Sequence, residues 1–185
     1  MDSLPYIDRL PLRAVGEELA VDAAATPHLW APRLLDHRPA APRLTVLFGD
    51  DRPPARASVE ALLEDFLRAE TARRLGPRLM ALADRAGIPR PSAVRVARQK
   101  TRWASRSSSG TVSLSVLLLF LPAPVADHVL LHELCHVVHM DHSPAFHALL
   151  EKLDPLARAH DASLRTADRD YVPRWINPRA APGAS

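Results

Sequence analysis

The stretch LHELCHVVHMDHSPAF, residues 131–146, sets the two helices around which the rest of this 185-residue chain is expected to fold. Its first part belongs to an apolar run, Val125 to Val138, that is typical of a mostly buried helix. Ser143 is a good N-cap and is followed by a proline suited to a first turn, which predicts a second helix from Pro144 to about Asp154. Asp141 tolerates the left-handed conformation that ends a helix, so we expect the chain to turn sharply there.

An HExxH motif lies inside the first of these helices. His132 and His136 are one turn apart on the same face, where their imidazoles can bind one zinc ion. Glu133 projects about 100° around the axis from His132, so it is better placed to take a proton from a metal-bound water than to bind the metal. The alternative is a helix whose histidines are simply hydrogen-bonded, but an imidazole-rich stripe in a buried helix is costly unless it is paired or metal-bound. The motif therefore predicts a hydrolase with one zinc ion per chain.

A third ligand is needed, because catalytic zinc usually takes three protein ligands and leaves one position for water. His139 is two turns from His132, about 10 Å along the helix axis, which is too far to share one ion. His142 lies in the expected turn and can fold back onto the metal, which gives the pattern HExxH-x5-H. Three imidazoles suit zinc best among divalent ions. We expect His139, Asp141 and His147 to lie around the ligands or in solvent.

Composition adds few constraints. The formal net charge is +3 and the sequence pI is about 9.6, which is mildly basic and does not by itself indicate a nucleic-acid partner. The single cysteine, Cys135, excludes an internal disulfide and is expected to be a small buried apolar residue. No secretory signal is visible, and the longest apolar run, Val116 to Val125, is interrupted by prolines and too short to span a membrane. These features predict a single cytoplasmic domain over residues 1–185 with no membrane partner.

The rest of the chain mixes strand and helix patterns, which predicts an α+β fold. A hairpin is expected over Leu4–Val21 with a turn at Gly16, and a loop over residues 22–43. The proline-rich tail, residues 173–185, is expected to be mobile, with Trp175 and Ile176 as the residues that could pack back on the core. Further strands are predicted over residues 44–48, 93–97 and 111–116.

The sequence also predicts where one long helix begins and breaks, and how deeply one strand is buried. Ser58 should cap a long helix, which kinks or splits at Gly76-Pro77 because proline cannot donate the next hydrogen bond of a helix. The strand over residues 111–116 alternates polar and apolar side chains, so we expect it to be half-buried, with its threonine and serines on the polar face.

Six basic residues lie between residues 90 and 106 with no acidic residue among them. A solvated strand and loop would account for them, since they follow no helical or phosphate-loop register. The alternative is a site for an anionic substrate or a nucleic-acid backbone. The six are Arg90, Arg95, Arg98, Lys100, Arg102 and Arg106.

These motifs together resemble the YgjP-like metallopeptidase family, which is related to the SprT-like and WLM-type zinc proteins. The resemblance rests on RWASR at residues 102–106, the Ser-Gly pair before the next strand, HELCH at 132–136 and HMDHSPAFH at 139–147. It implies a small zincin-like fold in which an antiparallel or mixed sheet packs on the HExxH helix, beside the long helix of the N-terminal half. It also implies His132, His136 and His142 as ligands and Glu133 as the catalytic glutamate.

The chain departs from the family pattern at four positions. Ala104 and Arg106 stand where the family has Gly and Cys. Ser115 stands where Asn is usual, and His147 stands where Trp is usual. None of these changes removes a ligand. The altered element from Trp103 to Arg106 is a candidate lining for the substrate side, so it bears on which substrate is preferred.

The leading hypothesis is a zinc metallopeptidase that cleaves a peptide or protein substrate with a zinc-activated water and Glu133 as general base. The strand over residues 111–116 could dock an extended peptide if it lies at a sheet edge, and Arg102 is a candidate oxyanion stabiliser. One alternative is a nucleoside triphosphate pyrophosphohydrolase using the same metal site, with the basic stretch holding the phosphates. Another is a zinc-stabilised binding module associated with DNA. The residues expected to contact substrate are Arg102, Trp103, Ser105, Ser113 and Ser115.

Overall fold

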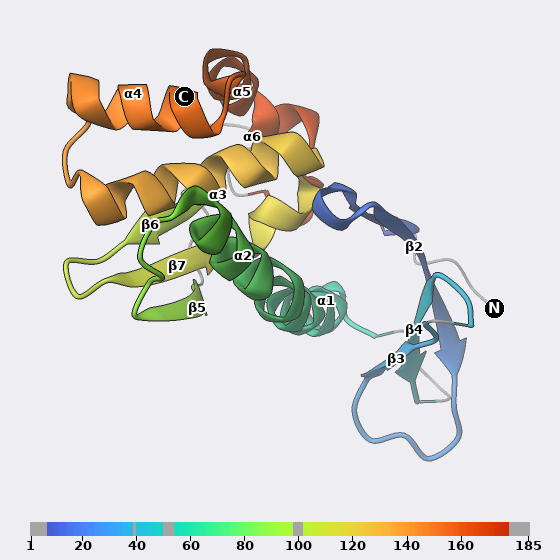
Figure 1. Ribbon diagram of the computed structural model, residues 1–185. Coiled ribbons are helices and arrows are strands. Elements are labelled where there is room, and N and C mark those ends of the chain that lie inside the picture. The colour runs from blue at the N-terminus through green and yellow to red at the C-terminus, as the bar shows by residue number, and fades with distance from the viewer. Residues whose placement is uncertain (1–6, 39, 50–53, 98–101, 178–185) are drawn as a thin grey trace.

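The computed structural model describes residues 7–38, 40–49, 54–97 and 102–177, and its fold class is α+β as expected (Figure 1). The strands are β1 (Arg9–Leu12), β2 (Glu17–Ala25), β3 (Arg33–Asp36), β4 (Arg43–Phe48), β5 (Ala93–Ala97), β6 (Ala104–Arg106) and β7 (Thr111–Ser115). The α-helices are α1 (Arg56–Glu70), α2 (Gly76–Ala86), α3 (Ala123–Val138), α4 (Pro144–Leu153), α5 (Ala157–Leu164) and α6 (Ala167–Asp170). Two 3-10 helices, η1 (Arg13–Val15) and η3 (Val116–Phe120), and one π-helical segment, η2 (Thr71–Leu75), complete the described elements. Their buried apolar side chains form one contiguous cluster.

The first sheet has the strand order β1-β2-β4-β3. The expected hairpin is present: β1 and β2 pair antiparallel, and Gly16 before β2 has a φ of 70°, which glycine adopts without strain. The strand expected over residues 44–48 is β4, parallel to β2 and antiparallel to β3. The loop predicted over residues 22–43 is wrong in part, because this segment contains the end of β2 and all of β3. Its pairing with β4 outweighs the weak strand pattern of the local sequence.

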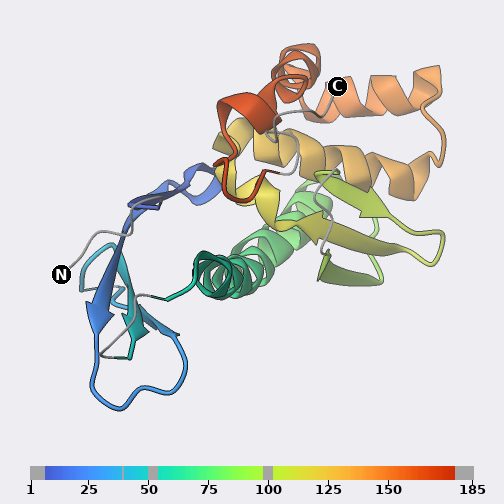
Figure 2. The ribbon, with the colours of Figure 1, turned by 180° about the vertical axis from the view of Figure 1, so that it is seen from behind.

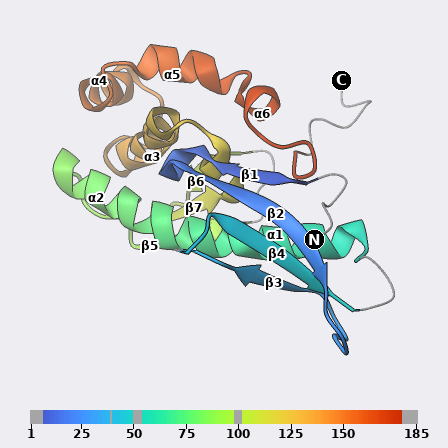
Figure 3. The same ribbon diagram turned by 90° about the vertical axis from the view of Figure 1, so that its right-hand side faces the viewer.

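The long helix of the N-terminal half is present as three successive segments, α1, η2 and α2 (Figure 3). The predicted Ser58 cap is wrong, because the helix already begins at Arg56 and has no side-chain cap. The predicted interruption at Gly76-Pro77 is confirmed. Pro77 has no N–H, and the turn before it is π-helical, with the Gly76 N–H donating to the Thr71 carbonyl.

The second sheet has three strands in the order β5-β7-β6. β7 is the central strand, parallel to β5 and antiparallel to β6, so the condition under which it could dock a peptide at a sheet edge is not met. The prediction that it is half-buried is also wrong, since Ser113 is 7% exposed and Ser115 is completely buried. Among the described residues β6 pairs with β7 alone, and it lies beside α3. β5 and β6 are therefore the two edges of this sheet in the described part of the chain, and β6 is the edge beside α3.

The HExxH helix, α3, lies between the second sheet and α4, as the front and back views both show (Figures 1 and 2). The two helices expected on either side of residue 141 are thus confirmed as α3 and α4. Near the C-terminus, Ile176 is buried and Trp175 packs on the core, so the start of the predicted mobile tail is anchored; residues 178–185 lie outside the described part. No helix in the described part of the chain is long and apolar enough to cross a bilayer.

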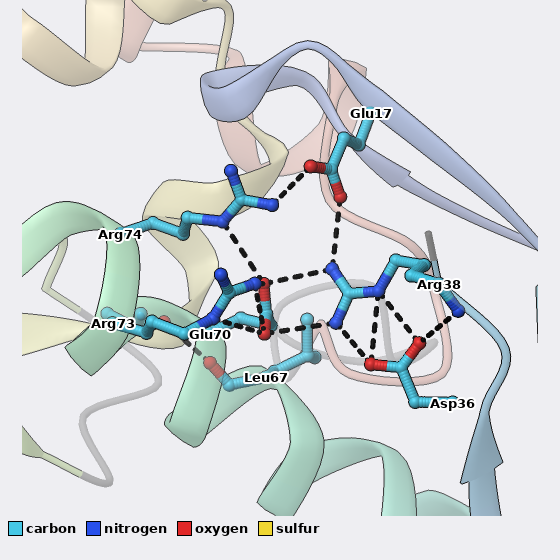
Figure 4. Close-up of polar contacts among 8 residues, drawn as sticks. Glu17, Asp36, Arg38, Leu67, Glu70, Arg73 and Arg74 are labelled. Carbon is cyan, nitrogen blue, oxygen red and sulfur yellow. Dashed lines mark hydrogen bonds and ion pairs between the residues drawn. The ribbon is translucent and has the colours of Figure 1, made fainter. Parts of the chain in front are cut away.

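Charged side chains join the first sheet to the long helix (Figure 4). The Arg38 guanidinium donates to both Glu70 carboxylate oxygens at 3.1 Å, and to Glu17 at 3.1 Å. Glu70 is only 4% exposed and also accepts hydrogen bonds from Arg73. A buried carboxylate with this many cationic partners fixes the sheet against the helix. We call this group the Arg38 cluster: Glu17, Asp36, Arg38, Glu70, Arg73 and Arg74.

Replacing Glu70 with alanine is expected to lower the free energy of unfolding by about 2–3 kcal/mol, because the change leaves the partly buried guanidinium of Arg38 without its most buried partner. Urea denaturation of the two chains measures this difference. The matched control is Asp84→Ala, which removes one partner of the exposed ion pair with Arg90 and should change stability little. Equal effects of the two substitutions would contradict a stabilising role for the Arg38 cluster.

The difference in unfolding free energy between the wild type and Glu70→Ala should depend on pH. The hydrogen bond from Arg38 lowers the pKa of Asp36 below its ordinary value of 3.8. Burial tends to raise the pKa of Glu70, but the hydrogen bonds from Arg38 and Arg73 outweigh it, so this pKa falls below its ordinary value of 4.5. The pKa values of both carboxyls are therefore lower in the folded chain than in the unfolded chain. The stabilisation is complete when the pH is above the unfolded-chain pKa values, and it is lost as the pH falls through the folded-chain pKa values. The stability gap between the wild type and Glu70→Ala should therefore be full at neutral pH and shrink in acid.

Candidate metal centre

Three histidines from two segments meet near the C-terminal end of α3. The ring centroids of His132 and His136 are 5.0 Å apart, those of His132 and His142 are 5.1 Å apart, and those of His136 and His142 are 4.7 Å apart. One nitrogen of each ring lies within 4.8 Å of the others, and the Nε2 atoms of His132 and His142 are separated by 3.2 Å. The structure thus brings together the three histidines that the sequence predicts as ligands.

The turn after α3 delivers His142 to this position. The helix ends at Val138, and His139 leaves it in an extended conformation, with φ of −125° and ψ of 111°. Ser143 then caps α4 by accepting a hydrogen bond from the backbone N–H of the third helical residue. The predicted left-handed conformation of Asp141 is wrong, because His28 is the one non-glycine residue with positive φ among those described. His139 and Ser143, at the two ends of the turn, are extended.

Phe146 supports all three imidazoles. Its completely buried ring lies 4.9 Å from the His132 ring, 4.7 Å from His136 and 4.8 Å from His142, centroid to centroid. Contacts of this kind are favourable for edge-on and tilted aromatic pairs. The apolar core therefore positions the histidines directly, which the sequence reasoning missed.

The surroundings of His132 and His136 suit metal ligands. The pKa of His132 is lowered to about 4, first by burial and then by the neighbouring imidazoles, so this ring is neutral at neutral pH and has a lone pair to offer. The Nδ1–H of His136 can donate to the His139 carbonyl at 3.2 Å, which leaves Nε2 directed to the other rings. Two nitrogen ligands of one tetrahedral zinc lie about 3.3 Å apart, close to the observed separation of the His132 and His142 nitrogens. The donor set therefore fits a zinc ion.

Glu133 lies beside the histidines and is not one of the converging donors. Its side chain is 6% exposed, and burial raises the pKa of its carboxyl to about 7, a change that the positive charge of Arg106 opposes. A carboxyl with a pKa near neutral can both accept and return a proton at neutral pH. Cys135, by contrast, is completely buried, and burial raises the pKa of its thiol to about 11, so it has the apolar role that the sequence predicts.

A cleft of about 330 Å³ opens between the edge strand β6 and these residues. Arg106 crosses it: its Nη1 lies 2.9 Å from the sulfur of Met140, which follows α3. The Nε of the same guanidinium is buried and has no hydrogen-bond partner within the described part of the chain. The cleft therefore holds a cation beside the candidate metal ligands. The lining residues are Arg102, Ala104, Ser105, Arg106, Glu133, His136, Met140 and His142.

The predicted substrate residues fall into two groups. Arg102 and Ser105 line the cleft. The Trp103 carbonyl instead accepts from the Ser115 N–H at 2.9 Å, and the Ser115 hydroxyl oxygen caps η3. Ser113 accepts a hydrogen bond from Arg95 on β5 at 3.2 Å. The structure therefore places these last three residues within the sheet and not along the cleft.

The basic stretch does not converge on the cleft. Arg90 forms an exposed ion pair at the end of α2, and Arg95 is bound within the second sheet. Arg102 and Arg106 line the cleft. In the part of the chain that the structure describes, the stretch thus offers two cations near the histidines and no phosphate-binding loop. Arg98 and Lys100 lie outside the described residues.

One family of known proteins matches most of the chain. A family model described as "YgjP-like, metallopeptidase domain" matches residues 38–167. The chain is similar to the crystal structure of the metallopeptidase zymogen of Pyrococcus abyssi abylysin, with 31% identity over 50% of this chain and 90% of that one and a TM-score of 0.42. No curated protein matches the chain. Because the family match covers more than half of the sequence and includes every residue of the candidate centre, the chain belongs to the YgjP-like metallopeptidase domain family.

Proposed function

We propose that the protein is a zinc metallopeptidase whose metal ligands are His132, His136 and His142. The observation that carries this proposal is the convergence of three imidazoles next to a buried glutamate. His136, His142 and Glu133 line a cleft whose far wall is an edge of a sheet. When bound, zinc acts as a Lewis acid that acidifies water and polarises a carbonyl group. Membership of a metallopeptidase family makes a peptide or protein the first substrate to test.

The residues of the chain have distinct roles in this proposal. The Glu133 carboxylate takes a proton from the attacking water and returns it to the leaving amine, as its near-neutral pKa allows. Arg106 lies in the cleft beside this carboxylate, so it is better placed than Arg102 to stabilise negative charge that develops on the substrate carbonyl oxygen. Phe146 keeps water from one side of the centre and holds the ligand rings.

The edge strand β6 is the proposed docking site for the substrate backbone. The Trp103 carbonyl accepts from the Ser115 N–H, and the Ser107 N–H donates to the Thr111 carbonyl. Hydrogen-bonded pairs alternate along an antiparallel ladder. The backbone groups of Ala104 and Arg106 therefore face away from β7, and both residues line the cleft. An extended peptide can pair with these groups and place one of its carbonyls beside the histidines.

Replacing Ala104 with proline is expected to raise KM for peptide hydrolysis about tenfold, because it removes one outward N–H and a hydrogen bond of this kind is worth about 1–1.5 kcal/mol. The ladder to β7 keeps its hydrogen bonds, so metal content should stay unchanged. Steady-state kinetics with a fluorogenic peptide measure the effect. Ala104→Ser, which retains the N–H, is the matched control and should behave as the wild type; an unchanged KM for the proline variant would argue against docking on β6.

The substrate class is tested with a panel. Purified protein loaded with zinc is given casein, a mixture of fluorogenic peptides and the common nucleoside triphosphates, each with and without a chelator. Chelator-sensitive cleavage of peptides supports the proposal. Chelator-sensitive hydrolysis of nucleotides with no cleavage of any peptide would overturn it.

A further inference from the structure

A second group of histidine and carboxylate side chains lies next to the candidate metal centre. Its residue on α3, His128, is one helical turn before His132. His128 belongs to α3, Asp154 follows α4, and His160 belongs to α5. The Nδ1 of His128 is 2.6 Å from Asp154 Oδ2, and the Nδ1 of His160 is 2.8 Å from the same oxygen. All three donor atoms lie within 4.8 Å of one another. Three segments of the helical layer therefore meet at one carboxylate oxygen.

The second group is at least as buried as the first. His128 is 1% exposed and Asp154 is 8% exposed. Polar groups at such depth are retained when they are fully partnered, by hydrogen bonds or by a metal. A cleft of about 410 Å³ is lined by the same three residues, so an ion has a route to them from solvent.

A fourth residue orients His128. Its second ring nitrogen, Nε2, lies 3.0 Å from Oδ1 of Asp161 on α5. Histidines that bind metals usually donate their other N–H to a carboxylate or a carbonyl, which fixes the tautomer and leaves the first nitrogen free for the metal. A histidine of the candidate metal centre is oriented in the same way, since the Nδ1 of His136 faces the His139 carbonyl. His128 thus has the surroundings of a metal ligand on both sides of its ring.

We propose that His128, Asp154 and His160 form a second metal site that binds a zinc ion, with Asp161 as the carboxylate that orients His128. Two imidazoles and one carboxylate are donors that zinc accepts at tetrahedral sites. The two carboxylates balance the charge of the ion. Because the ligands come from α3, the end of α4 and α5, the ion would hold the helical layer together and contribute to stability without taking part in hydrolysis.

The proposal is tested by metal content of the full chain. Protein is stripped with a chelator, reloaded with excess zinc, desalted and analysed by elemental mass spectrometry. We expect two zinc ions per wild-type chain, one for His160→Gln, one for His142→Ala and none for the double variant. His147→Ala, which removes an exposed imidazole of α4 outside both groups, is the matched control and should keep two.

Two further measurements separate a lost ligand from a lost fold. Zinc should raise the thermal unfolding midpoint of His142→Ala, which retains the second site, and this shift should disappear in the double variant. Asp161→Asn keeps all three ligands and should weaken zinc binding at the second site about 10–100-fold. Peptide hydrolysis by His160→Gln should persist, so failure of the second site and failure of the proposed peptidase give different results.

One zinc ion per wild-type chain, with none in His142→Ala, would overturn the proposal. In that case His128, Asp154, His160 and Asp161 form a hydrogen-bonded network only. The proposed peptidase site would be unaffected by that outcome.

Discussion

Replacing Glu133 with glutamine is expected to lower kcat for peptide hydrolysis by about 10³-fold or more while zinc content stays at the wild-type value. The glutamine side chain has nearly the same volume and can fill the same buried position, but it cannot take a proton from water. Because Glu133 is not one of the converging nitrogen donors, its loss removes no ligand. Steady-state kinetics on zinc-loaded protein, with zinc measured in the same sample, give both quantities.

Asp141→Asn serves as the control for this experiment. It makes the same carboxylate-to-amide change at an exposed residue close to the ligands, and hydrolysis should persist. Undiminished hydrolysis by the Glu133→Gln chain would exclude this residue as the base. Loss of zinc from that chain would instead show that the glutamate holds the metal.

Replacing His142 with alanine is expected to remove the zinc ion of the candidate active site and to reduce hydrolysis to background. Two imidazoles on one helix remain, and a site with two ligands binds zinc far more weakly than one with three. The side chain of His142 is exposed, so the change should cost little stability. Elemental analysis should show one zinc ion fewer than in the wild type, and circular dichroism should show an unchanged fold.

His139→Ala is the informative comparison, because His139 is also a histidine next to the motif and contacts His136 through its backbone carbonyl. The backbone survives this substitution, so zinc content and hydrolysis should both be retained. A chain that loses zinc on removal of His139 and keeps it on removal of His142 would show that the third ligand is misassigned.

Much of the candidate site could be predicted because it is encoded locally. The spacing of His132 and His136 fixes them on one helix face, and Ser143-Pro144 starts the next helix at a set distance from His142. Two short-range rules therefore bring three histidines together without knowledge of the sheet. The hairpin around Gly16 and the interruption before Pro77 follow from equally local properties of glycine and proline.

The arrangement of the strands was harder to predict from the sequence, because it depends on pairing partners far away in the chain. The alternation over residues 111–116 correctly predicts a strand, but alternation cannot show whether a strand lies at the centre or the edge of its sheet. The second face of β7 is buried by other parts of the fold, so Ser113 and Ser115 are internal residues that bond to their neighbours. β3 is a strand only because β4 is beside it.

The sequence also contained an unused signal. His128 precedes His132 by four residues, so the repeat of histidines at 128, 132 and 136 forms one stripe along α3. Its partners, Asp154 and His160, come from segments that reach it only through the packing of α4 and α5 on α3. Arg106 could not be placed either, because its position across the cleft depends on how β6 sits beside α3.

The ring of Phe146 has one more consequence. Its contacts with His132, His136 and His142 are packing contacts between aromatic rings and need no ion to persist. The three nitrogens are therefore preorganised by the interior of the protein, and little conformational entropy remains to be lost when zinc arrives. We therefore expect that a metal ion can leave and return to this site without refolding of the chain.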